Sequence, residues 1–221
     1  MLKIIAVAVA VVGLAGAAHA QSELVTNGSF EAGLDSWNST GPCDFSVRSS
    51  GSTYGVPAPS GPADGASYVS VAPSSSYAAC VLYQDVAIPA ASTAQLSFAA
   101  SAGFSNDANT AEYSGGFEVR SLADAVLETP FQRDGSQASA PLLANYSADL
   151  SAYAGQTVRL AIVFNNGVQC CNETFADNVS VLASTPAAAA PVPTMSEWAM
   201  ILLGVALAGG AALMIQRRRT A

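Results

Sequence analysis

The chain has 221 residues, of which 51% are hydrophobic and only 11% are charged, and its net charge is −8. This apolar content argues against a disordered chain, and the absence of a 3.5-residue repeat argues against a coiled coil. Sixteen acidic residues against eight basic ones also argue against nucleic-acid binding, because a phosphate-binding surface needs clustered Lys and Arg.

Residues 1–20 have the pattern of a secretory signal peptide. Lys3 provides a positive charge, an uninterrupted apolar run follows, and Ala18-His19-Ala20 forms an A-x-A cleavage site before Gln21. A retained membrane anchor is the alternative, but the small residues favour cleavage by signal peptidase after passage through the secretion machinery. His19 is the only histidine of the chain, so the mature protein would lack histidine-dependent catalysis and His-ligated metal sites.

Residues 21–182 are predicted to form one domain of antiparallel strands. Apolar residues recur with a period of two in Val158, Leu160, Ile162 and Phe164, while Arg159 falls on the opposite face, which is typical of a half-buried strand. Further strands are expected at residues 66–72, 79–86, 95–100, 116–121 and 175–182, between clusters of Gly, Pro, Asn, Asp and Ser. No amphipathic helix is evident in this region. The pattern predicts an all-β fold, an antiparallel β-sandwich.

Four segments of this domain resemble a known family. Residues 24–33, followed by Trp37, resemble the opening strand of the galactose-binding-like jelly rolls, which include many carbohydrate-binding modules. Residues 177–181 resemble the closing strand of that family, and residues 82–86 and 150–158 lie where the family places similar strands. The resemblance implies a jelly roll, a fold that serves sugar binding, adhesion and structural roles alike.

The same resemblance implies a structural calcium site between the first and last strands. It would place the carboxylates of Glu31 and Asp177 as ligands, with the main-chain carbonyl of Asn27 nearby, and such oxygen atoms are the ligands that Ca²⁺ prefers. The alternative needs no metal: Glu31 caps a turn and Asp177 accepts hydrogen bonds from main-chain amides.

A sugar-binding surface is expected to expose aromatic rings that stack on pyranose rings. The candidates in loops or at strand ends are Tyr54, Tyr77, Phe104 and Tyr113, beside a polar loop that contains Asn106, Asp107 and Asn109. Trp37 is expected in the core instead. For each tyrosine the alternative is a ring packed on the sheet with its hydroxyl at the surface.

The four cysteines, Cys43, Cys80, Cys170 and Cys171, are an even number in an exported chain, which predicts disulfides. Three pairings can be drawn. One of them joins Cys170 to Cys171 and leaves Cys43–Cys80 as the other link, whereas the other two join Cys43 and Cys80 separately to Cys170 and Cys171. We expect one of the latter, because a bridge between adjacent cysteines strains the backbone. A catalytic thiol and a four-thiolate zinc site are both disfavoured, by the missing histidine and by the oxidising compartment.

The C-terminal region has a spacer and a candidate membrane helix. Residues 183–191 carry no charge and no large apolar side chain, which indicates a linker. Residues 198–215 contain no charge and are long enough to span a bilayer, with Trp198 at one interface. The arginine cluster at residues 217–219 would remain on the cytoplasmic side.

The segment before this span resembles a bacterial sorting signal. Val192-Pro193-Thr194-Met195-Ser196-Glu197-Trp198 is similar to the IPTL-CTERM signal, a relative of PEP-CTERM, and departs from its usual residues at Val192 and Met195. The resemblance implies that an exosortase-type membrane transpeptidase recognises the signal and removes the helix. The protein would be anchored in the inner membrane before processing, then released to the cell envelope or the exterior.

Together these features predict an exported, non-catalytic β-sandwich protein of the cell surface or matrix that binds a glycan such as an exopolysaccharide. One alternative is a structural or adhesive envelope protein without a specific ligand. A glycoside hydrolase is the other alternative, and it would need two acidic side chains about 5–10 Å apart in a cleft.

Overall fold

A computed structural model describes residues 20–74, 79–105, 113–137, 139–165, 172–185 and 195–219. The chain divides into a β-domain, His19–Pro186, and a second unit that contains the C-terminal helix.

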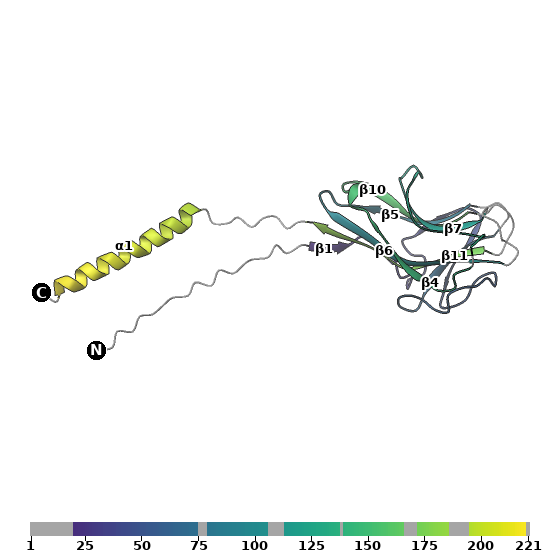
Figure 1. The fold of residues 1–221 in the computed structure, drawn as a ribbon, viewed down its shortest axis with the longest axis horizontal. Coiled ribbons are helices and arrows are strands. Elements are labelled where there is room, and N and C mark those ends of the chain that lie inside the picture. The colour runs from purple at the N-terminus through teal and green to yellow at the C-terminus, as the bar shows by residue number, and fades with distance from the viewer. Residues whose placement is uncertain are drawn as a thin grey trace. The chain divides into compact units, whose positions relative to one another are not determined.

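The β-domain is a sandwich of two antiparallel sheets (Figure 1). We call them sheet A, with strand order β3-β4-β11-β6-β9 and β1 paired to β11, and sheet B, with strand order β2-β5-β10-β7-β8. The strands are β1 (Ala20–Glu23), β2 (Asn38–Thr40), β3 (Cys43–Arg48), β4 (Tyr68–Pro73), β5 (Ala79–Ala87), β6 (Thr93–Phe104), β7 (Ser114–Arg120), β8 (Val126–Asp134), β9 (Ala144–Asp149), β10 (Thr157–Asn165) and β11 (Asn172–Thr185). The predicted all-β antiparallel sandwich is therefore confirmed.

Alternating side chains from both sheets fill the space between them. In β10 the predicted inward set, Val158, Leu160, Ile162 and Phe164, is buried, and Arg159 lies on the outer face. The rings of Phe98 from sheet A and Phe117 from sheet B stack with their centroids 4.0 Å apart. Such contacts between large apolar side chains supply the main driving force for folding.

The segment that resembles an opening strand folds differently from the expectation. β1 ends at Glu23, and residues 24–36 form successive turns, with Asn27 and Phe30 at positive φ angles of 53° and 57°. The Asn27 side chain stabilises these turns by donating hydrogen bonds to the carbonyls of Gly33 and Asp35. Asn tolerates left-handed backbone better than most residues, so the Asn-Gly sequence favours a turn over an extended strand.

Residues 150–158 also differ from the expected strand, because a short 3-10 helix, η1 (Ser151–Tyr153), precedes β10. Trp37 lies in the core as expected and packs on Phe30, with ring centroids 5.1 Å apart.

One disulfide joins the two sheets, and it corrects the predicted pairing. Cys43 at the start of β3 bonds to Cys80 in β5, with their Cα atoms 5.8 Å apart. The prediction that each of these residues binds separately to Cys170 or Cys171 is wrong, because the fold brings β3 of sheet A beside β5 of sheet B. Cys170 and Cys171 lie outside the described residues.

The second unit contains one helix, α1 (Met195–Arg219). Its segment Trp198–Arg218 has a mean hydropathy of 2.2 and is long and apolar enough to cross a membrane. Met195, Ser196 and Glu197 of the sorting motif form the start of this helix, whereas Val192, Pro193 and Thr194 lie outside the described residues.

Candidate functional site

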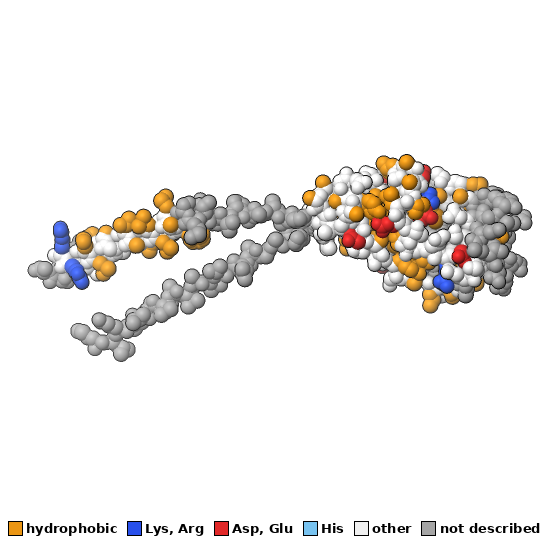
Figure 2. Space-filling model, turned by 45° about the horizontal axis from the view of Figure 1, so that its top comes forward, with side chains coloured by type: hydrophobic (Ala, Val, Ile, Leu, Met, Phe, Trp, Pro, Cys, Tyr) orange, Lys and Arg blue, Asp and Glu red, His pale blue; other side chains and the backbone are white. Residues whose placement is uncertain are grey.

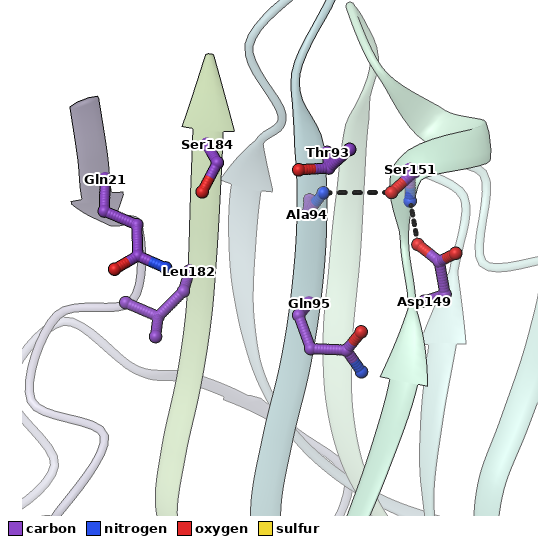
Figure 3. Close-up of a pocket in the computed structure, with 8 residues that line it drawn as sticks. All are labelled: Gln21, Thr93, Ala94, Gln95, Asp149, Ser151, Leu182 and Ser184. Atoms are coloured by element: carbon purple, nitrogen blue, oxygen red, sulfur yellow. Dashed lines mark hydrogen bonds between the residues drawn. The ribbon is translucent and has the colours of Figure 1, made fainter. Parts of the chain in front are cut away.

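An open groove lies on the outer face of sheet A, where β1, β11, β6 and β9 run side by side (Figure 3). Its volume is about 410 Å³. The residues that line it are mostly amides, hydroxyls and one carboxylate: Gln21, Thr93, Ala94, Gln95, Asp149, Ser151, Leu182 and Ser184. We call this site the sheet A groove.

Strand periodicity and register assemble the sheet A groove. In β6, Thr93 and Gln95 point outward while the intervening Ala94 is buried, as period-two alternation requires. Thr93 lies opposite Ser184 of β11, and Gln95 lies between Leu182 of β11 and Asp149 of β9. Side chains from distant parts of the sequence therefore meet on one face.

Hydrogen bonds hold one wall of the sheet A groove. The Ser151 hydroxyl accepts a hydrogen bond from the Ala94 amide at 3.1 Å, and the Ser151 amide donates to Asp149 Oδ1 at 2.9 Å. Hydrogen bonds from Ser151 lower the pKa of Asp149, so this carboxylate is ionised at neutral pH. The Gln95 amide nitrogen donates to the Ala148 carbonyl at 2.9 Å, which fixes that side chain across the edge of the sheet.

The opposite wall keeps its hydrogen-bonding groups available. Within the residues that the structure describes, the side chains of Gln21, Thr93 and Ser184 have no hydrogen-bond partner. Leu182, two residues before Ser184 on β11, lies beside them with 40% of its surface exposed. A surface that combines amide and hydroxyl groups with a small aliphatic patch can bind a ligand that carries many hydroxyls and a C–H face.

The described candidates for a sugar platform, Tyr54, Phe104 and Tyr113, do not line this groove. Phe104 and Tyr113 lie at strand ends as expected, but they are only 4% and 8% exposed and belong to the core, which corrects the expectation that their rings are exposed. Tyr54 is half-buried, and its hydroxyl donates to Asp44, which raises the pKa of Tyr54 to about 12. Tyr77, Asn106, Asp107 and Asn109 lie outside the described residues.

A long segment, residues 49–67, covers the other half of the outer face of sheet A. Three carboxylates hold it, each by accepting hydrogen bonds from two main-chain amides: Glu173 from residues 53 and 54, Asp177 from residues 63 and 64, and Glu31 from residues 66 and 67. Glu173 and Asp177 are completely buried. This segment therefore packs on sheet A away from the sheet A groove, whose lining residues lie near the start of β6 and the end of β11.

The residues expected to bind calcium lie around this segment. Glu31 and Asp177 bind neighbouring parts of it, and the Asn27 carbonyl accepts a hydrogen bond from the Trp37 ring at 3.1 Å. Burial raises the pKa of Asp177, because the described residues place no cation beside it and the nearby charge of Asp64 is also negative. The oxygen donors suit Ca²⁺ in chemical type, although the described residues contain no group of three acidic, His or Cys side chains arranged for a metal.

The outer face of sheet B carries an ion-pair network that sequence reasoning did not find. Arg159 donates to both carboxylate oxygens of Asp85, at 2.8 and 3.1 Å, and to Asp124 at 2.7 Å. Its guanidinium lies 3.8 Å from the centre of the Tyr83 ring. The guanidinium of Arg159 on β10 thus contacts β5 through Asp85 and Tyr83 and the β7–β8 turn through Asp124. Because these contacts occupy the guanidinium, we call the network a structural brace between these elements and not an open binding surface.

Comparisons with known proteins identify the C-terminal segment and the fold. Residues 190–219 match the IPTL-CTERM motif, so the chain carries this sorting signal. No curated protein matches the chain in sequence.

Solved structures of similar fold include carbohydrate-binding modules. The module TmCBM61, solved in complex with β-1,4-galactotriose, has a TM-score of 0.50 and 12% identity, over 72% of this chain and 97% of that one. The mannan-recognising module TmCBM27 has a TM-score of 0.40 and 11% identity, over 75% and 98% of the two chains. An arabinose-bound MgGH51 α-L-arabinofuranosidase has a TM-score of 0.48 and 13% identity, over 77% of this chain and 27% of that one. At 12% identity, the similarity to TmCBM61 shows the β-sandwich fold alone.

Proposed function

We propose that this chain is an exported, non-catalytic protein that binds an uncharged glycan in the sheet A groove. The observation that carries the proposal is the groove itself, in which amide and hydroxyl groups without internal partners surround the exposed Leu182. Sugar hydroxyls are both donors and acceptors, so the Thr93 and Ser184 hydroxyls can pair with them in either direction. The similarity of the fold to a galactotriose-binding module supports this function.

The charges of the domain favour an uncharged ligand over an acidic polysaccharide. Residues 21–191 contain fifteen acidic side chains and only four arginines. Arg120 pairs with Glu118 at 2.6 Å, Arg159 pairs with two aspartates, Arg48 donates to Ser46 and Thr53, and Arg133 is also engaged. Figure 2 shows acidic side chains at several places on the face it draws. No cation lines the groove among the described residues, so a polyanion would meet repulsion there.

The groove supports binding in preference to hydrolysis. A glycoside hydrolase of the usual kind needs two carboxyl groups, one with a raised pKa so that it can protonate the leaving group. Asp149 is the single carboxylate among the lining residues, and its pKa is lowered. An ionised lone carboxylate can accept a hydrogen bond from a sugar hydroxyl but cannot act as the acid of a catalytic pair.

Calcium is a further part of the proposal. An ion bound by Glu31 and Asp177 would offset the buried negative charge of Asp177 and stabilise residues 63–67, which both carboxylates contact. Such an ion would be structural and would not take part in ligand binding.

Delivery to the cell surface completes the proposed function. The IPTL-CTERM segment and the apolar helix fit a membrane-anchored, exported protein. An exosortase-type transpeptidase would then process the signal and release the β-domain to the envelope or the exterior. β11 continues to Thr185, so only the Ala/Pro-rich sequence after it, residues 186–191, would act as the spacer that gives that enzyme access to the motif.

A matched pair of polysaccharides tests the binding function. We expect the detergent-solubilised full-length protein to bind neutral galactan or dextran, and to bind polygalacturonate or dextran sulfate more weakly. Gln95→Ala and Leu182→Ser should each weaken the binding several-fold, because they remove a fixed amide and the aliphatic patch. Gln132→Ala, an exposed glutamine on β8, is the matched control and should bind like wild type. Stronger binding to the acidic partner would contradict an uncharged ligand.

One observation favours the structural or adhesive alternative. Within the described part of the β-domain, the strongly exposed large apolar side chains are all aliphatic: Leu122, Val126, Leu127, Leu142 and Leu182. Glycan-binding surfaces usually use an exposed aromatic ring. If the full-length protein binds none of a broad panel of neutral and acidic polysaccharides, the structural role replaces the glycan-binding function.

A further inference from the structure

The residue that would begin the exported chain is a glutamine on the rim of the sheet A groove. Cleavage after Ala20 makes Gln21 the N-terminal residue, and Gln21 lies in β1, opposite Ser184 of β11. Export therefore creates a new α-amine at a defined place in the fold (Figure 3).

The register of β1 leaves the main-chain nitrogen of Gln21 unused by the sheet. The Leu24 amide donates to the Val181 carbonyl at 3.0 Å, and the pairing of Glu23 with Leu182 makes Leu24 and Val181 direct neighbours. Residues on an antiparallel strand alternate between those that exchange main-chain hydrogen bonds with the partner and those that do not. Leu24, Ser22 and Ala20 therefore face β11, and the nitrogen of Gln21 points away from it.

The side chain of Gln21 is equally unconstrained. It is exposed, and it has no hydrogen-bond partner among the described residues. The α-nitrogen and the side-chain amide carbon Cδ of an N-terminal glutamine can close a five-membered ring. Reaction within one residue is favoured because no second molecule has to be brought into position.

We propose that Gln21 is a modification site at which the exported chain forms an N-terminal pyroglutamate. The α-amine attacks Cδ, a new N–Cδ bond forms, and the bond from Cδ to the side-chain nitrogen breaks. That nitrogen leaves as ammonia with one proton from the α-amine, so no oxidant, reductant or other co-reactant is needed. The ladder between β1 and β11 remains intact, because its hydrogen bonds involve Ser22 and Leu24.

The modification has two consequences. The lactam carries no charge, so the sheet A groove gains no cation when the signal peptide is removed. An N-terminal lactam also blocks aminopeptidases, which would otherwise degrade β1 from an end that is held only by its pairing with β11.

Peptide mass spectrometry of the exported protein tests this proposal. The full chain is expressed with its own signal peptide, recovered from the exported and membrane fractions, reduced and digested with trypsin. We expect almost all of the N-terminal peptide, residues 21–48, to be lighter by one ammonia and to resist Edman sequencing until a pyroglutamyl peptidase is added. Gln21→Asn is the matched control, because an asparagine amide would have to close a four-membered ring. This variant should retain a free N-terminus that sequencing reads directly.

Three results would overturn the proposal: an N-terminal peptide with intact Gln21, an N-terminus at another residue, or a lactam fraction that starts at zero and grows only with digestion time. None of these readouts depends on glycan binding. The modification and the proposed function can therefore fail independently.

Discussion

At the scale of single residues, Arg159 joins three separate parts of sheet B through one guanidinium. It binds Asp85 and Asp124 and covers the Tyr83 ring, and only 14% of its side chain is exposed. Hydrogen bonds to its carboxylate partners raise the pKa of Arg159 above its ordinary value, so its charge is permanent. Because β5, β10 and the β7–β8 turn all contribute to this network, its loss should affect the whole sheet.

We expect Arg159→Ala to lower the free energy of unfolding by about 1 kcal/mol, since it removes ion pairs to two solvent-exposed aspartates and the contact with the Tyr83 ring. Arg159→Lys should cost less but should not match wild type, because an ammonium group cannot bind Asp85 through two nitrogens and Asp124 through a third. Urea denaturation followed by circular dichroism measures both variants. Gln132→Ala on β8 is the surface control, and an Arg159→Ala midpoint equal to that of the control would contradict the brace.

The stability of the β-domain should depend on pH through the carboxyl group of Asp177. Burial raises the pKa of its carboxyl in the folded chain, so the folded state binds a proton more tightly than the unfolded state. The stabilisation from that proton is complete below the ordinary pKa of aspartate and is lost as the pH rises through the raised value. In EDTA, wild type should therefore lose stability relative to Asp177→Asn as the pH rises from acid to neutral. Thermal unfolding of the two proteins across this range measures the difference.

Calcium should offset the loss of stability that wild type shows at neutral pH. At a calcium concentration a hundredfold above the Kd, binding to the folded state alone would add about 2.7 kcal/mol. The Tm of wild type should rise with Ca²⁺ at neutral pH, whereas the Tm of Asp177→Asn should change much less. Magnesium, which prefers a smaller and stricter geometry, is the matched ion control. An unchanged wild-type Tm on addition of Ca²⁺ after EDTA treatment would refute the calcium site.

At the scale of elements, the Cys43–Cys80 disulfide connects one sheet to the other across 37 residues of sequence. A covalent link of this length restricts the unfolded chain and stabilises the folded state by about 4 kcal/mol on the chain-entropy model. The double variant Cys43→Ala, Cys80→Ala should therefore unfold at a much lower urea concentration while its circular dichroism spectrum keeps the strand signal. A urea midpoint equal to that of wild type would show that the disulfide does not stabilise the domain. Non-reducing peptide mapping of wild type confirms the pairing independently.

The elements differ in how well their sequences predict them. β5, β6, β10 and β11 contain alternating apolar residues, and sequence analysis places all four strands, although it ends β6 and β11 too early. β8 and β9 lie at sheet edges with mostly exposed side chains, so little alternation marks them. The short β2 has no buried residue at all. The strength of the prediction thus follows the amount of apolar surface that each strand buries.

The candidate site is harder to predict than the fold because it exists only through strand register. In the sequence, Thr93 and Gln95 look like ordinary outward-facing residues of a strand. Nothing near Gln95 in the sequence indicates that Leu182 and Asp149 lie beside it in the sheet. Phe104 is not available to an aromatic platform for a related reason, since it falls on the inward face of its strand. Composition and charge, by contrast, argue against nucleic-acid binding without any knowledge of the register.

At the scale of the whole molecule, the chain consists of a β-domain with its own core and a separate apolar helix. The β-domain closes on itself, because β1 at its beginning pairs with β11 at its end. Stability of the domain should therefore not depend on the helix, and sorting should not depend on the groove. Variants in one unit can be interpreted without reference to the other.

The role of the sorting signal can be tested in the full chain. In a host that has an exosortase-type enzyme, the full chain should appear first in the membrane fraction and then as a shorter, released product. Pro193→Ala should keep the protein in the membrane, because it alters the motif and leaves the helix Met195–Arg219 unchanged. Pulse-chase labelling with an antibody to the β-domain measures both forms. Ala206→Leu, a change in the apolar helix beyond residues 192–198, is the control and should be processed like wild type. Normal release of the Pro193→Ala variant, or of wild type in a host without the enzyme, would show that another protease detaches the domain.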